Sequence, residues 1–242
     1  MAEGGRRIRR HAGPLRRNGG GAGYAHDISE GVHTECERSQ NNEGANPMKE
    51  KAEGIVKNSM KHCGTLRLET ERLVLRQFVI EDAEAMFRNW ASDPEVTKYL
   101  TWPTHAGVDV SRSVLKDWTE AYANRNYYQW AIVLKEDGEC PIGSIGAVDL
   151  NDDLSIVHIG YCLGRAWWHR GIMSEALKAV MDFFFNAVGA NRIEARHDPR
   201  NPHSGMVMRK CGMKYEGTLR SSDRNNQGIC DVCWYAILKS ER

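Results

Sequence analysis

The sequence lacks the marks of several large classes of protein. Its 242 residues contain no apolar run near the roughly 18 that a membrane helix needs, and no apolar stretch typical of a secretory signal. Neither sign of charge dominates, because 33 Lys and Arg residues are set against 32 Asp and Glu residues. We therefore expect a cytoplasmic protein with no membrane partner and no nucleic-acid partner.

Cysteine is present, but not in a pattern that suits a disulfide framework or a metal site. The 7 cysteines are odd in number and lie mostly in hydrophobic segments, which favours free thiols in a reducing compartment. Cys230 and Cys233 form a lone Cys-x-x-Cys pair within a predicted strand, where their side chains point to opposite faces. No second pair completes a zinc site, so the sequence predicts no metal.

The first part of the chain differs in composition from the rest. Arginines cluster before residue 18, glycines stand at 19–21, and no segment there could bury a core. We expect residues 1–66 to be a disordered extension, because such a stretch cannot offset its ordering entropy. Two alternatives stay open: a basic targeting or nucleic-acid-binding arm, and translation that begins at Met48 or Met60.

From Arg67 to residue 242 the hydrophobic pattern predicts one α/β domain. Apolar residues between Met173 and Phe184 recur with the period of a helix packed on a sheet. The order of elements indicates a mixed sheet flanked by about four helices, with an antiparallel meander in its middle. Strands are expected at 68–76, 127–134, 141–150, 155–163, 192–196, 214–219 and 230–238, and helices at 81–89, 108–124, 171–188 and 202–211. Pro94 and Pro103, between the first two helices, are expected to mark turns.

The segment after the strand at 155–163 suits a phosphate group. A strand that feeds a glycine turn and a helix start leaves main-chain N–H groups without partners, and the helix dipole adds about half a positive charge there. Gly171 would let a diphosphate approach the main chain, while His169 and Arg170 can add donors or charge. Many helix starts bind nothing, so this segment alone does not decide. Neither Gly-x-Gly-x-x-Gly nor Gly-x-x-x-x-Gly-Lys-Ser/Thr occurs, which disfavours a nucleotide site of those kinds.

Two segments resemble the GNAT acetyltransferase superfamily. The first is similar to its acetyl-CoA signature, although Trp168 and Met173 depart from the general pattern and only Gly171 matches it. The form Trp-x-x-Gly-Ile-Met-Ser-Glu-Ala-Leu is closer to the branch that acetylates the N-terminal serine or alanine of ribosomal proteins. Downstream, residues 201–220 resemble the family's Asn-x-x-Ser helix and Glu-Gly segment.

The resemblance implies a GNAT-like fold and a site for acetyl-CoA as co-substrate. The sheet would be mostly antiparallel and would splay between its fourth and fifth strands, here 155–163 and 192–196, with CoA in the opening. The residues expected to contact it are Tyr161, Cys162, Leu163, Trp168, His169, Arg170, Gly171, Ile172, Met173, Ser174 and Asn201. Asn201 is also explained as an ordinary helix N-cap before Pro202.

The resemblance also suggests catalytic and substrate residues. Ser204 would help to protonate the leaving thiolate, by hydrogen bonding or relay through water, and Asp223 matches the position given the role of base. The alternative for Asp223 is a solvated turn. Trp102 and Trp130, with His105 and Tyr128, are candidates for the acceptor pocket, although aromatic residues in such numbers are more often core.

The activity that follows is direct transfer of acetyl from acetyl-CoA to a primary amine. A protein N-terminal amine, with a pKa near 8, is easier to deprotonate than a lysine near 10.4. A polyamine, an amino acid or an aminoglycoside stays open as acceptor, as does a non-catalytic acyl-CoA sensor. The chain would act as a monomer or a homodimer.

Overall fold

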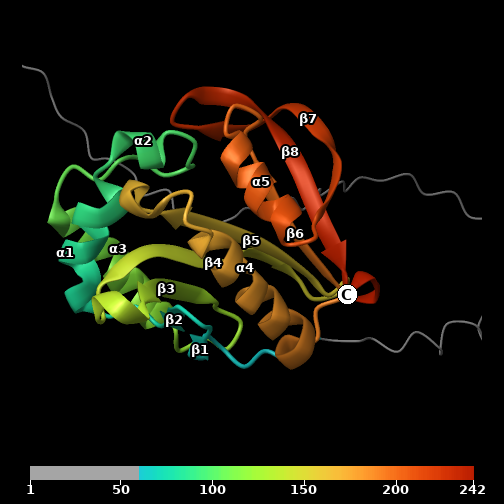
Figure 1. The fold of residues 1–242 in the computed structure, drawn as a ribbon, viewed down its shortest axis with the longest axis horizontal. Helices are drawn as coiled ribbons and strands as arrows, with labels where there is room; N and C mark the ends of the chain where they lie inside the picture. The colour runs from blue at the N-terminus through green and yellow to red at the C-terminus, as the bar shows by residue number, and fades with distance from the viewer. Residues whose placement is uncertain (1–59) are drawn as a thin grey trace, which may run out of the picture. The chain divides into compact units, whose positions relative to one another are not determined.

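A single eight-stranded sheet forms the centre of the molecule (Figure 1), in a computed structural model that describes residues 60–242. Along the sheet the strands run β1-β2-β3-β4-β5-β6-β8-β7, and only the β5–β6 pair is parallel. This confirms the predicted mixed, mostly antiparallel sheet. The strands are β1 (Leu68–Glu69), β2 (Leu73–Arg76), β3 (Gln129–Leu134), β4 (Pro141–Asn151), β5 (Ile156–Leu163), β6 (Arg192–His197), β7 (Lys214–Asn225) and β8 (Gly228–Leu238).

The described part of the chain begins at Met60, ahead of the expected domain start at Arg67. Met60 is buried in the core, with 5% of its surface exposed. The Lys61 main-chain N–H donates to the Val188 carbonyl at 2.8 Å. Residues 60–66 therefore pack against the domain, and the expected disorder of the preceding stretch lies outside the described residues.

Within residues 60–242 the sheet is flanked by five α-helices. They are α1 (Ala83–Met86), α2 (Pro94–Thr97), α3 (Val108–Ala121), α4 (Ile172–Phe183) and α5 (Pro202–Lys210), and π-helical turns at Phe87–Ala91 and Phe184–Val188 extend α1 and α4. Helix α2 was not predicted, because Pro94 was taken as a turn. Asp93 caps this helix by accepting from the Glu95 N–H at 3.0 Å, and Pro94 takes the first helical position. Within residues 60–242 no helix is long and apolar enough to span a bilayer.

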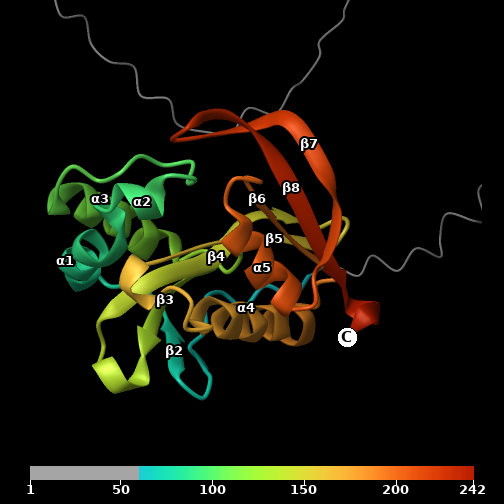
Figure 2. The same ribbon diagram turned by 45° about the horizontal axis from the view of Figure 1, so that its top comes forward.

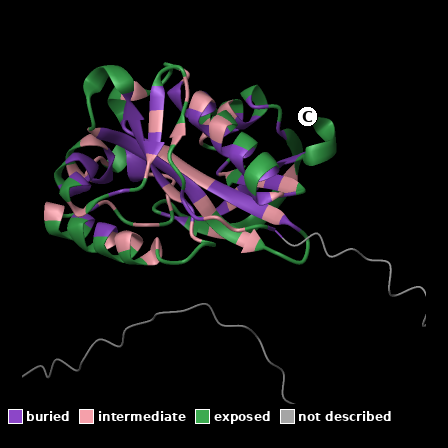
Figure 3. Ribbon diagram, turned by 90° about the horizontal axis from the view of Figure 1, so that it is seen from below, coloured by how far each residue is buried: buried purple, intermediate pink, exposed green. Residues whose placement is uncertain are grey.

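The two faces of the sheet carry separate hydrophobic clusters. In Figure 1, α4 and α5 lie side by side in front of the sheet, while α1 and α3 lie at its left end. The α4 face buries Val157, Ile159 and Ile193 of the central strands. The α1 and α3 cluster buries Ala131 and Val133 on the opposite face. Figure 3 shows the buried strands between these layers, with exposed residues on the outside.

The β7–β8 hairpin is longer than predicted. Strand β7 continues past Leu219 to Asn225, because an irregularity between Leu219 and Asp223 carries the extra residues, with Ser221 in the left-handed region at φ 48°. Figure 2 shows the hairpin rising away from α4. At its tip the Asn226 amide donates to the Thr97 and Trp102 carbonyls at 2.8 Å each. The hairpin tip is thus tied to the loop that follows α2.

Helix α5 is pressed against the end of β6 at Gly205. A Cβ placed there would lie 2.5 Å from Nε2 of His197. The imidazole has little freedom to move, since its Nδ1 donates to the Asp198 carbonyl at 2.8 Å and its ring packs on Tyr235. Only glycine lets α5 approach β6 this closely.

Replacing Gly205 with alanine is expected to lower the free energy of unfolding by about 1–3 kcal/mol, because the added methyl overpacks the contact with His197. Urea unfolding measures this. Gly107→Ala is the control, since no atom lies within 4 Å of its Cβ position. Gly107 is the N-cap of α3, where alanine is disfavoured, so this variant should cost about 0.5–1 kcal/mol. Equal costs for the two variants would contradict the close approach.

Candidate active site

Strands β5 and β6 part after a short paired stretch. Three residue pairs join them, from Ile156 with Arg192 to His158 with Glu194. Beyond these pairs β5 continues to Leu163 and β6 to His197 without pairing to each other. The sheet therefore opens between these two strands, at the place that the sequence predicted.

The start of α4 lies just after the open end of β5. Gly171 is its N-cap residue with φ 74°, and His169 also has a positive φ of 61°. No side chain caps this helix. The main-chain N–H groups of Ile172, Met173 and Ser174 accordingly have no hydrogen-bond partner within residues 60–242, and the helix dipole makes the spot attractive for an anion.

Two cationic side chains flank Gly171. A Cβ placed on this residue would lie 3.7 Å from both Arg72 Nη2 and Lys210 Nζ. Arg72 is fixed by Glu175 of α4, with Nε to Oε2 at 2.7 Å, and by the Arg170 carbonyl at 3.0 Å. Arg72 thereby holds the turn as well as adding charge to it. The sequence analysis missed both cations, because they come from the bend before β2 and from the end of α5, and no local motif connects them to the turn.

Trp168 helps to fix the conformation of the turn before α4. Its indole Nε1 donates to the Leu163 carbonyl at 2.7 Å, which ties the turn back to the end of β5. Leu163 itself is buried. The neighbouring rings of His169 and His203 pack edge to face at 4.8 Å and join the turn to the start of α5. Arg170 is exposed and lies 3.5 Å from Glu136.

Tyr161 and Ser204 meet beneath α5. The Tyr161 hydroxyl lies 3.0 Å from Ser204 Oγ and 3.1 Å from the Ser204 carbonyl. Burial raises the pKa of Tyr161 above its usual range, although the hydrogen bond to Ser204 opposes this, so the phenol stays protonated and can donate. Asn201 occupies the N-cap position of α5, but its side chain makes no capping hydrogen bond. The predicted N-cap position before Pro202 is confirmed, but the side chain does not cap the helix.

The aromatic residues proposed for the acceptor pocket divide into two groups. Trp130 and Tyr128 are fully buried against Phe183 and Phe184, and Nε1 of Trp130 donates to the Leu66 carbonyl at 2.6 Å. They are core residues with no surface open to an acceptor.

Trp102 is only half-buried, and its ring packs on His105 at 5.3 Å. Its carbonyl anchors the β7–β8 hairpin through Asn226. Asp223 lies in β7 rather than in a turn, and its Oδ2 is 3.1 Å from Arg196.

Both the sequence and the fold have known relatives. Residues 72–214 match the family model described as acetyltransferase (GNAT) domain. This chain belongs to the GNAT acetyltransferase family. The uncharacterized N-acetyltransferase p20 of Bacillus licheniformis is 33% identical over 174 residues, which cover 72% of this chain and 97% of the relative.

Two further proteins are similar to this GNAT N-acetyltransferase, one in structure and one in part of its sequence. A GNAT acetyltransferase from Bacillus anthracis has a solved structure that aligns with a TM-score of 0.64 and 25% identity, over 72% of this chain and 99% of the other. The ribosomal protein uS5-alanine N-acetyltransferase of Escherichia coli is 33% identical over 60 residues, which are 25% of this chain and 31% of that protein.

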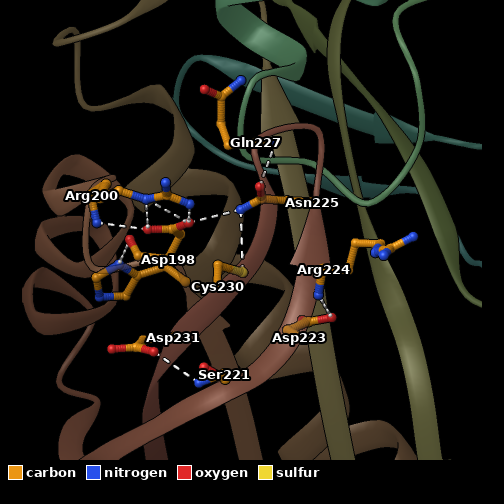
Figure 4. A network of polar contacts seen from close by, with 10 residues as sticks. Asp198, Arg200, Ser221, Asp223, Arg224, Asn225, Gln227, Cys230 and Asp231 are labelled. Atoms are coloured by element: carbon orange, nitrogen blue, oxygen red, sulfur yellow. Dashed lines mark hydrogen bonds and ion pairs between the residues drawn. The ribbon is translucent and has the colours of Figure 1, made fainter.

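A buried carboxylate locks the β6–α5 turn of the acetyltransferase to its hairpin. Asp198 accepts from Arg200, from Nη2 at 2.6 Å and from the main-chain N–H at 2.8 Å, and from the Asn225 amide at 2.8 Å (Figure 4). Asn225 also contacts Cys230 at 3.4 Å. Burial alone would raise the pKa of Asp198, but the hydrogen bonds from Arg200 and Asn225 outweigh it and lower the pKa to about 2.

No group of three or more potential ligands in the described residues is arranged to hold a metal ion.

Asp198→Asn is expected to lower the free energy of unfolding by about 2 kcal/mol at neutral pH. Because the folded pKa lies below the ordinary 3.8, the stabilisation is complete above about pH 4 and is lost as the pH falls toward 2. Denaturant unfolding at several pH values checks this: the two proteins should converge in acid. Asp109→Asn, at a surface ion pair with Arg112, is the control and should cost under about 1 kcal/mol. A pH-independent gap would contradict the account.

Proposed function

We propose that this chain transfers the acetyl group of acetyl-CoA directly to a primary amine, and that the amine is the N-terminus of a protein. The observation that carries the proposal is the row of main-chain N–H groups at the start of α4, flanked by Arg72 and Lys210 and next to the opening between β5 and β6. A diphosphate fits this chemistry, because it accepts several hydrogen bonds at once and carries negative charge.

The open side of β5 would hold the pantetheine arm. The main chain of residues 159–162 lacks a strand partner toward β6, so its polar groups on that side can pair with the amides of an extended ligand. The Asn201 amide, which makes no capping bond, faces no competing partner in the described chain. Acetyl-CoA supplies the acetyl group as an activated thioester.

The Tyr161–Ser204 pair would stabilise the departing thiolate. Both hydroxyls lie on the α5 side of β5, and each can donate a hydrogen bond, either one directly or through the other. Hydrogen-bond stabilisation is physically easier for a serine than outright proton donation. We assign Ser204 this stabilising role, with Tyr161 as its hydroxyl partner.

Transfer would not pass through an acetyl-cysteine. Cys162 is the cysteine on β5 itself, and its thiol lies 3.3 Å from Ser144 Oγ. Burial raises the pKa of Cys162 to about 11. Little thiolate exists at neutral pH, and the thiolate is the nucleophilic form. Direct attack by the amine is therefore the simpler route.

Two considerations favour a protein N-terminus as the acceptor. A neutral amine is required for attack, and an N-terminal amine is about 2.5 pKa units easier to deprotonate than lysine, which corresponds to about 3 kcal/mol. The Escherichia coli relative is named for an alanine of a ribosomal protein. Trp102 and Asp223 would line the acceptor side, below the hairpin.

A screen of amines for thiol release from acetyl-CoA tests the function. The panel contains peptides that begin with alanine or serine, the same peptides with a blocked N-terminus and a free lysine, spermidine, free amino acids and an aminoglycoside. We expect turnover on the free N-terminal peptides and none on the blocked ones. Turnover restricted to small amines would overturn the proposal of a protein acceptor. Binding of acetyl-CoA without turnover on any amine would overturn the proposal that the chain is an enzyme.

Gly171→Glu serves as the matched negative variant in that screen. Its carboxylate would enter the anion site next to Arg72 and Lys210, so calorimetry should detect no acetyl-CoA binding. Gly189→Glu is the control, because Gly189 has the same left-handed backbone, with φ 84° against 74°, and no atom lies within 4 Å of its Cβ position. Unchanged affinity in Gly171→Glu would count against the site.

A further inference from the structure

His158 stands at the point where β5 and β6 part. It belongs to the last of the residue pairs that join the two strands, opposite Glu194. Its side chain is 8% exposed, and Nδ1 lies 3.4 Å from Glu194 Oε1. A buried histidine and carboxylate are thus paired at the bottom of the opening.

The pair is held in place from both sides. Glu194 accepts from Arg192 Nε at 2.9 Å, and Arg192 is fixed in turn by Glu216 of β7 at 2.8 Å. The Trp234 indole packs edge-on against the imidazole of His158, with ring centroids 5.1 Å apart. The imidazole therefore has a fixed orientation.

The chemistry of the pair leaves one nitrogen of His158 ready to accept a proton. A carboxylate only accepts hydrogen bonds, so Nδ1 carries the proton and Nε2 carries the lone pair. The side-chain contact that His158 makes in residues 60–242 is through Nδ1, which leaves Nε2 without a hydrogen-bond partner there. Nε1 of Trp234 is a buried N–H donor that likewise has no partner in the described chain. The rings that carry this acceptor and this donor are in contact.

The charges around His158 favour its neutral form. Burial lowers the pKa of His158, and Arg196 of β6 adds to this effect, while Glu194 of β6 and Asp149 of β4 oppose it. From β8 the neighbouring group is the uncharged Trp234. A neutral imidazole at physiological pH can act as a base.

The side of β5 on which His158 lies is opposite to the Tyr161–Ser204 pair. Side chains at alternate positions of a strand share a face, so His158 lies with Gly160 and Cys162, while Tyr161 points toward α5. In a direct transfer the amine adds to one face of the planar thioester carbonyl, while the sulfur leaves from a different position on the carbon, so the two need separate proton-transfer groups. The two sides of β5 thus offer one group for each.

We propose that His158 takes the proton from the acceptor amine, through Nε2 and either directly or by way of one water molecule, with Glu194 as its positioning residue. The inference rests on the proposed acetyl transfer. The amine nitrogen forms the bond to the acetyl carbon, and the carbon–sulfur bond breaks with its electron pair going to sulfur. The amine proton passes to His158 and then to solvent, and the thiolate, stabilised from the Ser204 side, takes a proton from solvent.

The test is the pH dependence of kcat/KM with acetyl-CoA and a peptide that begins with alanine. Below the pKa values of both groups, the logarithm of kcat/KM should fall with a slope of about two in the wild-type enzyme, one proton each for amine and His158. In His158→Gln the slope should be about one, and kcat should fall by at least about 100-fold. KM for acetyl-CoA should stay within about twofold of the wild-type value. In Glu194→Gln the part of the pH profile that reports His158 should move to lower pH, because the carboxylate that raises the pKa of His158 is gone.

Two further variants separate a chemical role from a structural one. His158→Ala should regain at least about tenfold in rate with added imidazole, which a folding defect would not do. His62→Gln is the matched control, since His62 also pairs with a carboxylate, Asp152 at 2.8 Å, and it should keep the slope of about two.

Three results would overturn the proposal. A slope of about two retained in a folded His158→Gln would exclude His158 as the base while leaving acetyl transfer intact. If the slope of log kcat/KM fell from about two to about one in Asp223→Asn instead, the base would be Asp223. No turnover by the wild-type enzyme on any amine of the panel would overturn the acetyl transfer and this inference together.

Discussion

The parting of β5 from β6 is the constraint on which the rest of the site depends. A parallel pair that separates after three residue pairs exposes main-chain polar groups in the middle of a sheet, where neighbouring strands would normally satisfy them. Such groups need a partner, and an extended ligand with amide groups is a natural one. The same parting sets the start of α4 beside the open edge and leaves room for Tyr161 to reach Ser204 beneath α5.

The surrounding structure holds this opening in shape. On the α4 side, Glu175 joins Arg72, just before β2, to the helix, and Trp168 ties the turn to the end of β5. On the hairpin side, Asp198 locks the β6–α5 turn to Asn225. These contacts come from segments far apart in the sequence, so the site exists only when the whole sheet is assembled. The unpaired ends of β5 and β6, which form the two sides of the opening, are thereby held apart.

Much of the fold could be predicted because hydrophobic period and turn chemistry are local properties. The strands of the meander and helix α4 were predicted close to their observed bounds, and two separated motifs gave the family. Helix α2 was missed because an Asp-Pro pair was taken as a turn, although it is equally an N-cap followed by a first helical residue. The length of β7 was missed because its bulge interrupts the alternation of polar and apolar residues.

The candidate site was harder to predict where it depends on tertiary contacts. Sequence spacing placed Gly171 and Ser204, but it could not show that Arg72 and Lys210 converge on the same turn. It also placed Trp130 in a pocket wall, whereas the ring is part of the core. Nor does any sequence pattern pair His158 with Glu194, since the contact arises from the register of two strands joined by a long crossover.

The central claim is that the main chain at the start of α4 binds the diphosphate of coenzyme A at the mouth of the β5–β6 opening. A crystal structure of the chain with coenzyme A tests it most directly. The account predicts diphosphate oxygens within hydrogen-bond distance of the N–H groups of residues 172–174, with the pantetheine arm running along β5. Coenzyme A bound elsewhere, with these N–H groups facing solvent, would contradict the account.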